Sequence, residues 1–182
     1  MPRRRSDQAQ APEPGTARLA ALRLLGRRDY SAAEIRTRLL DRGHNPAEVE
    51  SAVTSLVGDG AIDDRRTAFA HVRTAARIKG RGTHRIRREL EARGISAGII
   101  ADALAQLSPD DDRAAIARIL ARRRTTPSDP GERRRLFQQL MRRGFSADII
   151  AKALAFDPAD LCPARDGRPP GAKTLRIQSP VA

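Results

Sequence analysis

The stretch "RIRRELEARGISAGIIADAL", residues 85–104, decides the fold because it holds two helical patterns joined by a glycine. Ile86 and Leu90 are one helical turn apart, and the same apolar spacing returns after Gly94. A glycine directly after an apolar helical pattern is typical of a left-handed residue that ends a helix. The stretch therefore predicts two short helices joined by a tight turn.

The same pattern occurs three times along the chain. The segments "EIRTRLLDRGHNPAEVESAV" (residues 34–53) and "RLFQQLMRRGFSADIIAKAL" (residues 135–154) align with the first stretch on an Arg-Gly pair and on the apolar positions around it. A repeat of this length indicates small units that pack mainly against their neighbours. The aligned glycines are Gly43, Gly94 and Gly144.

Each repeat also has a leading segment with helical spacing. In "ARLAALRLLGRR" (residues 17–28) we expect Leu19, Leu22 and Leu25 to form the buried face. Corresponding apolar positions occur in residues 65–78 and 112–124, where we expect Phe69 and other apolar residues to be core. No segment alternates over enough residues to predict a strand. The fold class predicted is all-α, with three tandem three-helix repeats.

The repeats set the predicted organisation of the chain. Residues outside the repeats contain Pro, Gly and charges without an apolar period, which is typical of disordered tails. The predicted parts are an N-terminal tail 1–16, repeats 17–64, 65–111 and 112–156, and a C-terminal tail 157–182.

Capping signals agree with the predicted helix starts. Ser31 precedes an apolar helical pattern and has Glu34 three residues on, which predicts a capping box. Asn45, with Pro46 after it and Glu48 three residues on, predicts a second one. In the second repeat we expect Thr83 to be the N-cap.

The composition points to an anionic partner. Lys and Arg number 35 against 22 Asp and Glu, which gives a net charge of +13. Such a charge suits nucleic acid, an anionic membrane or an acidic protein surface, without choosing among them. No apolar run is long enough to cross a bilayer, and no apolar stretch follows the N-terminal arginines as in a secretory signal. We expect a cytoplasmic protein.

Nothing in the sequence has the pattern of an enzyme site. Gly80 and Gly82 follow a predicted helix and not a strand, and no Lys-Ser/Thr pair comes after them, so a phosphate-binding loop is excluded. The three histidines lack metal-ligand spacing, and the single cysteine, Cys162, lies in the predicted tail. We expect no catalytic residues, no metal and no cofactor.

Arginines lie off the apolar faces of the second and third repeats. Any one of them is more simply explained as a solvated residue, but as a set their excess charge favours contact with an anionic surface. Asp63 and Asp64 are interpreted as a helix cap with first-turn charge. The residues predicted to contact a partner are Lys79, Arg81, Arg85, Arg88, Arg93, Arg134 and Arg142.

Three segments carry a resemblance to a known family. These are "LLGRRDYSAAEIRTRLLDRG" (residues 24–43), "IDDRRTAFA" (residues 62–70) and "KGRGTHRIRRELEARGI" (residues 79–95). In order and spacing they resemble the RecX family of recombination regulators, which modulate the RecA recombinase. The resemblance covers about residues 17–156 and is strongest in the first two repeats.

The resemblance implies a curved, elongated monomer that binds in the helical groove of the RecA–DNA filament. It implies inhibition of ATP hydrolysis, filament growth and strand exchange, in recombination, DNA repair and the SOS response, with weak direct DNA contact. The alternative is a sequence-tolerant DNA-binding or nucleoid protein, because a helix–turn–helix unit with exposed arginines can enter a major groove. A structural scaffold for another protein is the third possibility.

Overall fold

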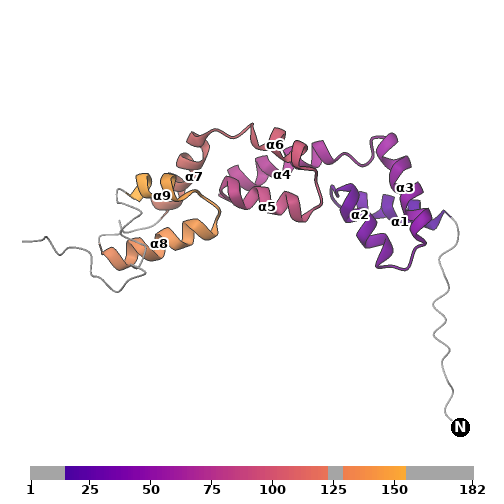
Figure 1. Cartoon of the computed structure of the whole chain (residues 1–182), viewed down its shortest axis with the longest axis horizontal. Helices are drawn as coiled ribbons and strands as arrows, with labels where there is room; N and C mark the ends of the chain where they lie inside the picture. Colours follow the sequence, from indigo (N-terminus) through magenta and orange to yellow (C-terminus); the bar gives the residue numbers. More distant parts are fainter. Residues whose placement is uncertain (1–14, 123–128, 155–182) are drawn as a thin grey trace, which may run out of the picture.

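The computed structural model describes residues 15–122 and 129–154, and this part of the chain forms nine α-helices without a strand. The predicted tails 1–16 and 157–182 lie almost entirely outside these residues. The helices follow one another as an elongated, gently arched row of three groups (Figure 1). The predicted all-α fold with three tandem three-helix repeats is confirmed.

The first repeat comprises α1 (Thr16–Leu25), α2 (Ala32–Leu40) and α3 (Pro46–Gly58). The second comprises α4 (Asp64–Arg77), α5 (Thr83–Ala92) and α6 (Ala97–Leu104). The third comprises α7 (Pro109–Ala121), α8 (Pro130–Arg142) and α9 (Ala147–Leu154).

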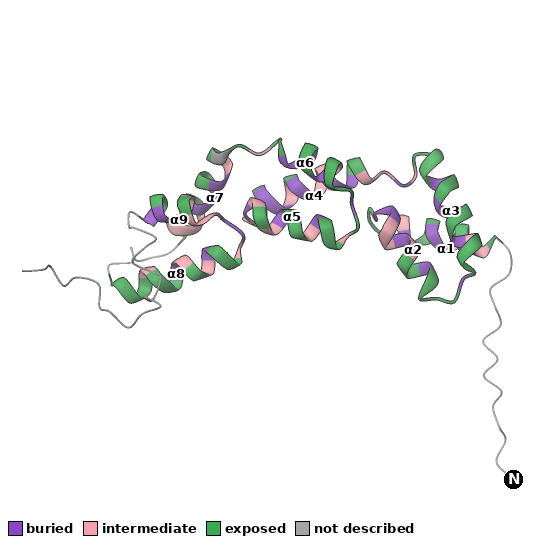
Figure 2. Cartoon of the chain, viewed as in Figure 1, coloured by how far each residue is buried: buried purple, intermediate pink, exposed green. Residues whose placement is uncertain are grey.

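Each repeat has a hydrophobic core of its own. The buried residues fall into three separate clusters, one for each repeat, and buried positions alternate with exposed ones along every helix (Figure 2). Ile86, Leu90 and Ile100 are at most 1% exposed, as their spacing predicts. Because the three cores do not merge, the contacts between repeats must come from other groups.

The aligned glycines end the middle helix of each repeat. Gly43, Gly94 and Gly144 have φ values of 82°, 70° and 88°, in the left-handed region that side chains disfavour. The residue after each of them donates its N–H to the carbonyl of the leucine four residues before the glycine, for example His44 to Leu39 at 3.2 Å. This turn lets the third helix of each repeat pack against the second.

The prediction for the leading helix of the first repeat was wrong for two of its three leucines, whereas Leu25 is partly buried and packs against the first core. Leu19 and Leu22 are 50% and 42% exposed, whereas the buried positions of α1 are Ala17, Ala21 and Leu24. Both faces have helical spacing, so periodicity could not separate them. The buried face of α1 thus combines two small alanines with one leucine where α1 packs against α3. Phe69, also predicted as core, is only partly buried beside the second cluster.

The capping predictions were correct at two positions and wrong at two. Ser31 and Glu34 form the predicted capping box, and Asn45 accepts a hydrogen bond from Ala47 N at 2.8 Å. Glu48, however, does not complete a second box. The N-cap of α5 is Gly82, and Thr83 is already helical. Gly82 needs no capping side chain because carbonyl groups of the third repeat bind this turn.

Candidate partner-binding surface

The contact between the first two repeats, here called the first junction, joins the N-terminus of α2 to the second repeat. The Ser31 hydroxyl donates a hydrogen bond to the carbonyl of Arg93, and Ala32 N donates to Asp64 Oδ1 at 2.8 Å. Asp63 is the N-cap of α4, as predicted, while Asp64 binds the neighbouring repeat. The first junction therefore depends on polar side chains.

The contact between the second and third repeats, here called the second junction, joins the N-terminus of α5 to the third repeat. Gly82 N donates to the Arg143 carbonyl at 2.8 Å, and His84 N donates to the Gly144 carbonyl at 3.0 Å. Thr83 Oγ1 donates to Asp112 Oδ2 at 3.1 Å. The second junction is therefore made mainly between two backbones.

The two junctions occupy equivalent places in the repeat. In each, the start of a repeat's middle helix contacts the Arg-Gly turn of the next repeat and an aspartate near the start of that repeat's leading helix. At the second junction the chains approach so closely that a Cβ on Gly82 would clash with the backbone of Gly144 and Phe145. Packing therefore requires glycine at both positions, and at Gly144 the left-handed backbone conformation requires it as well.

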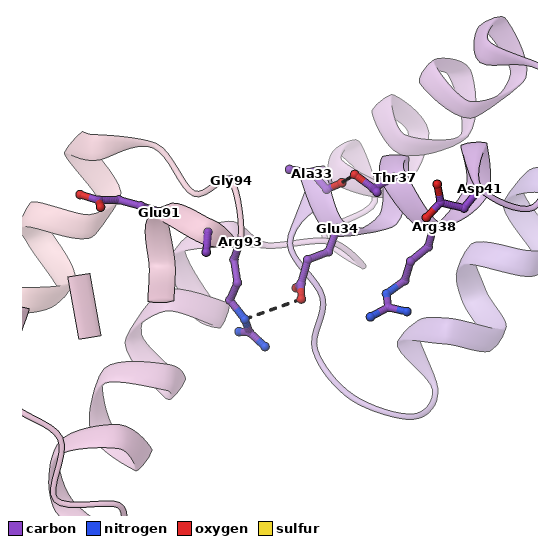
Figure 3. Close-up of a pocket in the computed structure, with 9 residues that line it drawn as sticks. Ala33, Glu34, Thr37, Arg38, Asp41, Glu91, Arg93 and Gly94 are labelled. Carbon is purple, nitrogen blue, oxygen red and sulfur yellow. Dashed lines mark hydrogen bonds and ion pairs between the residues drawn. The ribbon is translucent and has the colours of Figure 1, made fainter. Parts of the chain in front are cut away.

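A groove of about 490 Å³ runs along the first junction, between α2 and the end of α5 (Figure 3). Arg93 points across it to Glu34, with Nε 3.7 Å from Oε1. The charges in the groove are nearly balanced, so it has little attraction for a strongly anionic partner. The charged lining residues are Glu34, Arg38, Asp41, Glu91 and Arg93.

Glu89 organises the basic residues at the start of α5. Its carboxylate accepts from Arg81, from Arg85 Nε at 2.9 Å and from His71 Nε2, which lies 3.0 Å away. Burial alone would raise the pKa of Glu89, but the hydrogen bonds from Arg85, His71 and Arg81 outweigh it and hold that pKa below its ordinary value. Arg81 and Arg85 thus have a structural partner within their own repeat.

The structure divides the residues predicted to contact a partner into two groups. Arg81 and Arg85 pair with Glu89, and Arg93 pairs with Glu34, so these three are partly buried and engaged in ion pairs. The others are exposed and form no ion pair within the described part of the chain. This exposed group comprises Lys79, Arg88, Arg134 and Arg142.

Two members of the predicted set meet across the second junction. Arg85 NH1 donates to the Arg142 carbonyl at 3.3 Å, which brings the end of α8 beside α5. Arg88 follows one helical turn after Arg85 on α5. Arg85 and Arg88 on α5 and Arg142 at the end of α8 therefore lie at the same junction, and these three residues are named here the α5–α8 surface.

Sequence reasoning placed Lys79 and Arg143 off the apolar faces, but it did not bring them together with other arginines into a second basic group at the same junction. Arg77, Arg118, Arg122 and Arg143 come from three helix ends and converge with Lys79 around a small cavity. The residues are far apart in sequence, so no local pattern predicts their meeting. The alignment of Arg143 with Arg93, beside the repeated glycine, was the one available signal.

The described residues hold no cluster of three His, Cys, Asp or Glu side chains suited to a metal ion. Among them, too, no helix has the length and apolarity that crossing a membrane requires. The described helices carry many exposed arginines, and these are the groups that a partner can contact.

These features define a class: a tandem-repeat helical protein with separate small cores and junctions of polar and backbone groups. Family models described as the first, second and third three-helix domains of RecX match residues 17–56, 63–104 and 110–154. The chain belongs to the RecX family.

Curated relatives agree over most of the chain. It is 38% identical to the regulatory protein RecX of Chromohalobacter salexigens, over 79% of this chain and 93% of the relative. It is also 38% identical to the regulatory protein RecX of Halorhodospira halophila, over 75% of this chain and 84% of the relative. The crystal structure of RecX from Lactobacillus salivarius matches with a TM-score of 0.66 at 24% identity, covering 80% of this chain and 94% of that one. The relatives are named as regulatory proteins.

Proposed function

We propose that this protein binds the RecA–DNA filament and inhibits RecA ATP hydrolysis, filament growth and strand exchange. The observation that carries the proposal is the match of all three repeats to the RecX family, together with relatives named regulatory protein RecX. It acts by binding and not by catalysis, as a cytoplasmic monomer, with weak direct contact to DNA. Its place is in recombination, DNA repair and the SOS response.

The α5–α8 surface is the proposed contact with the filament. Arg88 and Arg142 are exposed and form no ion pair in the described residues, so their guanidinium groups can fork to carboxylates or phosphates of a partner. Arg81, Arg85 and Arg93 contribute differently. Their ion pairs with Glu89 and Glu34 hold the helices that present the exposed arginines.

The test follows ATP hydrolysis by RecA on single-stranded DNA at increasing concentrations of this protein. The parent should inhibit, and the double variant Arg88→Glu, Arg142→Glu should need at least about tenfold more protein, which corresponds to a loss of about 1.4 kcal/mol. The inhibition should also weaken with added salt, because exposed charges are screened.

A matched control separates a specific surface from general charge. Arg23→Glu with Arg27→Glu reverses the same number of charges at exposed positions of the first repeat, and it should inhibit like the parent. Circular dichroism should show the same helical content in both variants. If the parent does not slow hydrolysis but binds bare duplex tightly, the alternative of a sequence-tolerant DNA-binding protein is correct. If the Arg88/Arg142 and Arg23/Arg27 variants lose inhibition equally, the α5–α8 surface is not the contact with the filament.

A further inference from the structure

A small basic cavity lies at the second junction, on the side where α4, α7 and α8 end. Its volume is about 50 Å³, and its lining includes five cationic side chains without a carboxylate. Organic ligands occupy pockets of roughly 300–1,000 Å³, whereas one water takes about 30 Å³. The cavity therefore suits a single small anionic group. The cationic residues are Arg77, Lys79, Arg118, Arg122 and Arg143.

Local structure holds part of this group in place. Arg118 NH1 donates to the Arg77 carbonyl at 3.3 Å, and its Nε donates to the Ala114 carbonyl at 3.4 Å. The guanidinium of Arg143 lies so near Gly80 that a Cβ there would be 3.7 Å from it. The third repeat thus brings a cation to the end of α4, and the cavity exists only because the two repeats are joined.

Helix ends alone do not account for so much positive charge. Arg77 is the last residue of α4, Arg122 is the C-cap of α7 and Arg143 is the C-cap of α8. Three helix C-termini supply about −0.5 charge each, or roughly −1.5 together, against five cations. Asp111 lies within electrostatic range of Arg77 and Arg118, but its carboxylate accepts from Ser108 N at 2.9 Å in the capping box of α7. An excess of positive charge remains at the cavity.

The geometry points to a phosphate as the anion. A planar carboxylate is satisfied by one arginine fork, whereas the oxygens of a phosphate accept hydrogen bonds from several directions. Here the donors come from α4 and the turn after it, from α7, and from the α8–α9 turn. We propose that this cavity binds a backbone phosphate of a nucleic-acid strand.

An apolar side chain at the same turn favours a phosphodiester over a free anion. Ile78 stands between Arg77 and Lys79, contributes to the lining and is 77% exposed. Along a nucleic-acid strand each phosphate is flanked by sugar and base surface, against which an exposed isoleucine can pack. The inference deepens the proposed DNA contact by naming its site, and it does not depend on binding to the recombinase.

The experiment measures binding of the full chain to a fluorescein-labelled 30-nucleotide single strand and to its duplex, by anisotropy and without RecA. Arg77→Gln with Arg122→Gln should weaken binding at least about tenfold. It should also lower the slope of log affinity against log salt by about 0.7 to 0.9, because the cavity binds one phosphate and each neutralised phosphate contributes about that much. The stronger effect, on the single strand or on the duplex, identifies which form of backbone the cavity binds.

The matched control is Arg23→Gln with Arg27→Gln, which removes the same charge from exposed positions of the first repeat. It should change affinity less than about threefold, because Arg23 and Arg27 lie in the first repeat and not at the cavity, and salt screens exposed charges over that separation. Equal weakening by both pairs would overturn the proposal in favour of general charge attraction. The conservative pair Arg77→Lys, Arg122→Lys keeps the charge and should recover most of the salt slope.

A free-anion site is the remaining outcome. Millimolar inorganic phosphate would then raise the melting temperature of the parent but not of the Gln pair, while both bind the oligonucleotide equally, and the proposal would be wrong. Assaying RecA hydrolysis with the same proteins keeps the two proposals apart. A parent that fails to inhibit RecA contradicts only the proposed function, and a Gln pair that binds DNA like the parent contradicts only the cavity.

Discussion

The first and second junctions perform the same task with different chemistry. At the first, Ser31 and Asp64 reach across with side chains, and the groove beside it is nearly balanced in charge. At the second, two glycine-containing turns meet backbone to backbone, and the adjacent cavity is lined by cations. The N–H groups at the start of the middle helix thus need hydrogen-bond acceptors, but these can be a side chain at one junction and backbone carbonyls at the other.

The difference matters because the cores do not cross the junctions. With three separate hydrophobic clusters, the angle between neighbouring repeats is set by a few hydrogen bonds and close backbone contacts. A junction made of side chains can adjust by rotamer changes, whereas one made of backbones can adjust only by moving a repeat. We therefore expect the second junction to be the less tolerant of substitution.

The largest effect should come from Gly144→Ala. The new Cβ would occupy a left-handed residue and clash with the backbone of Arg85, which no rotamer change can relieve. The left-handed conformation costs about 1–2 kcal/mol and overpacking about 1–3 kcal/mol, so the free energy of unfolding should fall by roughly 3 kcal/mol. Urea unfolding followed by circular dichroism measures the change.

Gly43→Ala is the matched control for this substitution. Gly43 has nearly the same backbone conformation, with φ 82°, but a Cβ there would meet nothing within 4 Å. Gly43→Ala should therefore lower the free energy of unfolding only by the cost of the left-handed conformation, about 1–2 kcal/mol. The difference between the two variants measures the second junction itself. Equal destabilisation would mean that the close approach of Gly144 to α5 contributes nothing.

A smaller effect is expected at the first junction from Gly94→Ala. Here the clash is with the Cβ of Ala33 only, so removing that methyl group should relieve it. Ala33→Gly alone should cost about 1 kcal/mol through lower helix propensity. In the double variant the two costs should not add, with a favourable coupling of about 1 kcal/mol in a double-mutant cycle. Additive costs would show that the two residues do not touch.

These contacts also mark the limit of what the sequence could predict. The repeats, the left-handed glycines and the cores around Ile86 and Leu90 follow from patterns within about twenty residues, and the structure confirms them. The wrong face of α1 shows where this fails, because Leu19 and Ala17 both satisfy helical spacing and only the packing against α3 chooses between them.

The candidate surface was predictable only in part. The sequence located arginines off the apolar faces, but it could not show that Glu89 binds Arg81 and Arg85 while Arg88 stays exposed. Nor could the sequence predict that Arg118 contacts Arg77 at the end of α4. The position of Arg118 depends on how one repeat lies against another, and that arrangement is set by contacts between residues about 30 to 60 positions apart.

The smallest expected effect is a difference in pH dependence between the junctions. At the first, burial would raise the pKa of Glu34, but the hydrogen bond from Ser31 N, with Arg28 and Arg93, holds it below its ordinary value of 4.5. At the second, burial raises the pKa of Asp112 above its ordinary value of 3.8, and the hydrogen bonds from Thr83 offset this only in part. The two carboxylates therefore respond to acid in opposite directions.

For Glu34 folding favours the charged form, so its contribution to stability is present above about pH 4.5 and is lost as the pH falls through its lowered pKa. For Asp112 folding favours the protonated form, so its contribution is present below about pH 3.8 and is lost as the pH rises through its raised pKa. Unfolding of Glu34→Gln and Asp112→Asn should be compared with the parent between about pH 3 and pH 7. As the pH falls, the stability of Glu34→Gln relative to the parent should improve and that of Asp112→Asn should worsen. Drifts of the same sign in both variants would show that the two junctions share one electrostatic response.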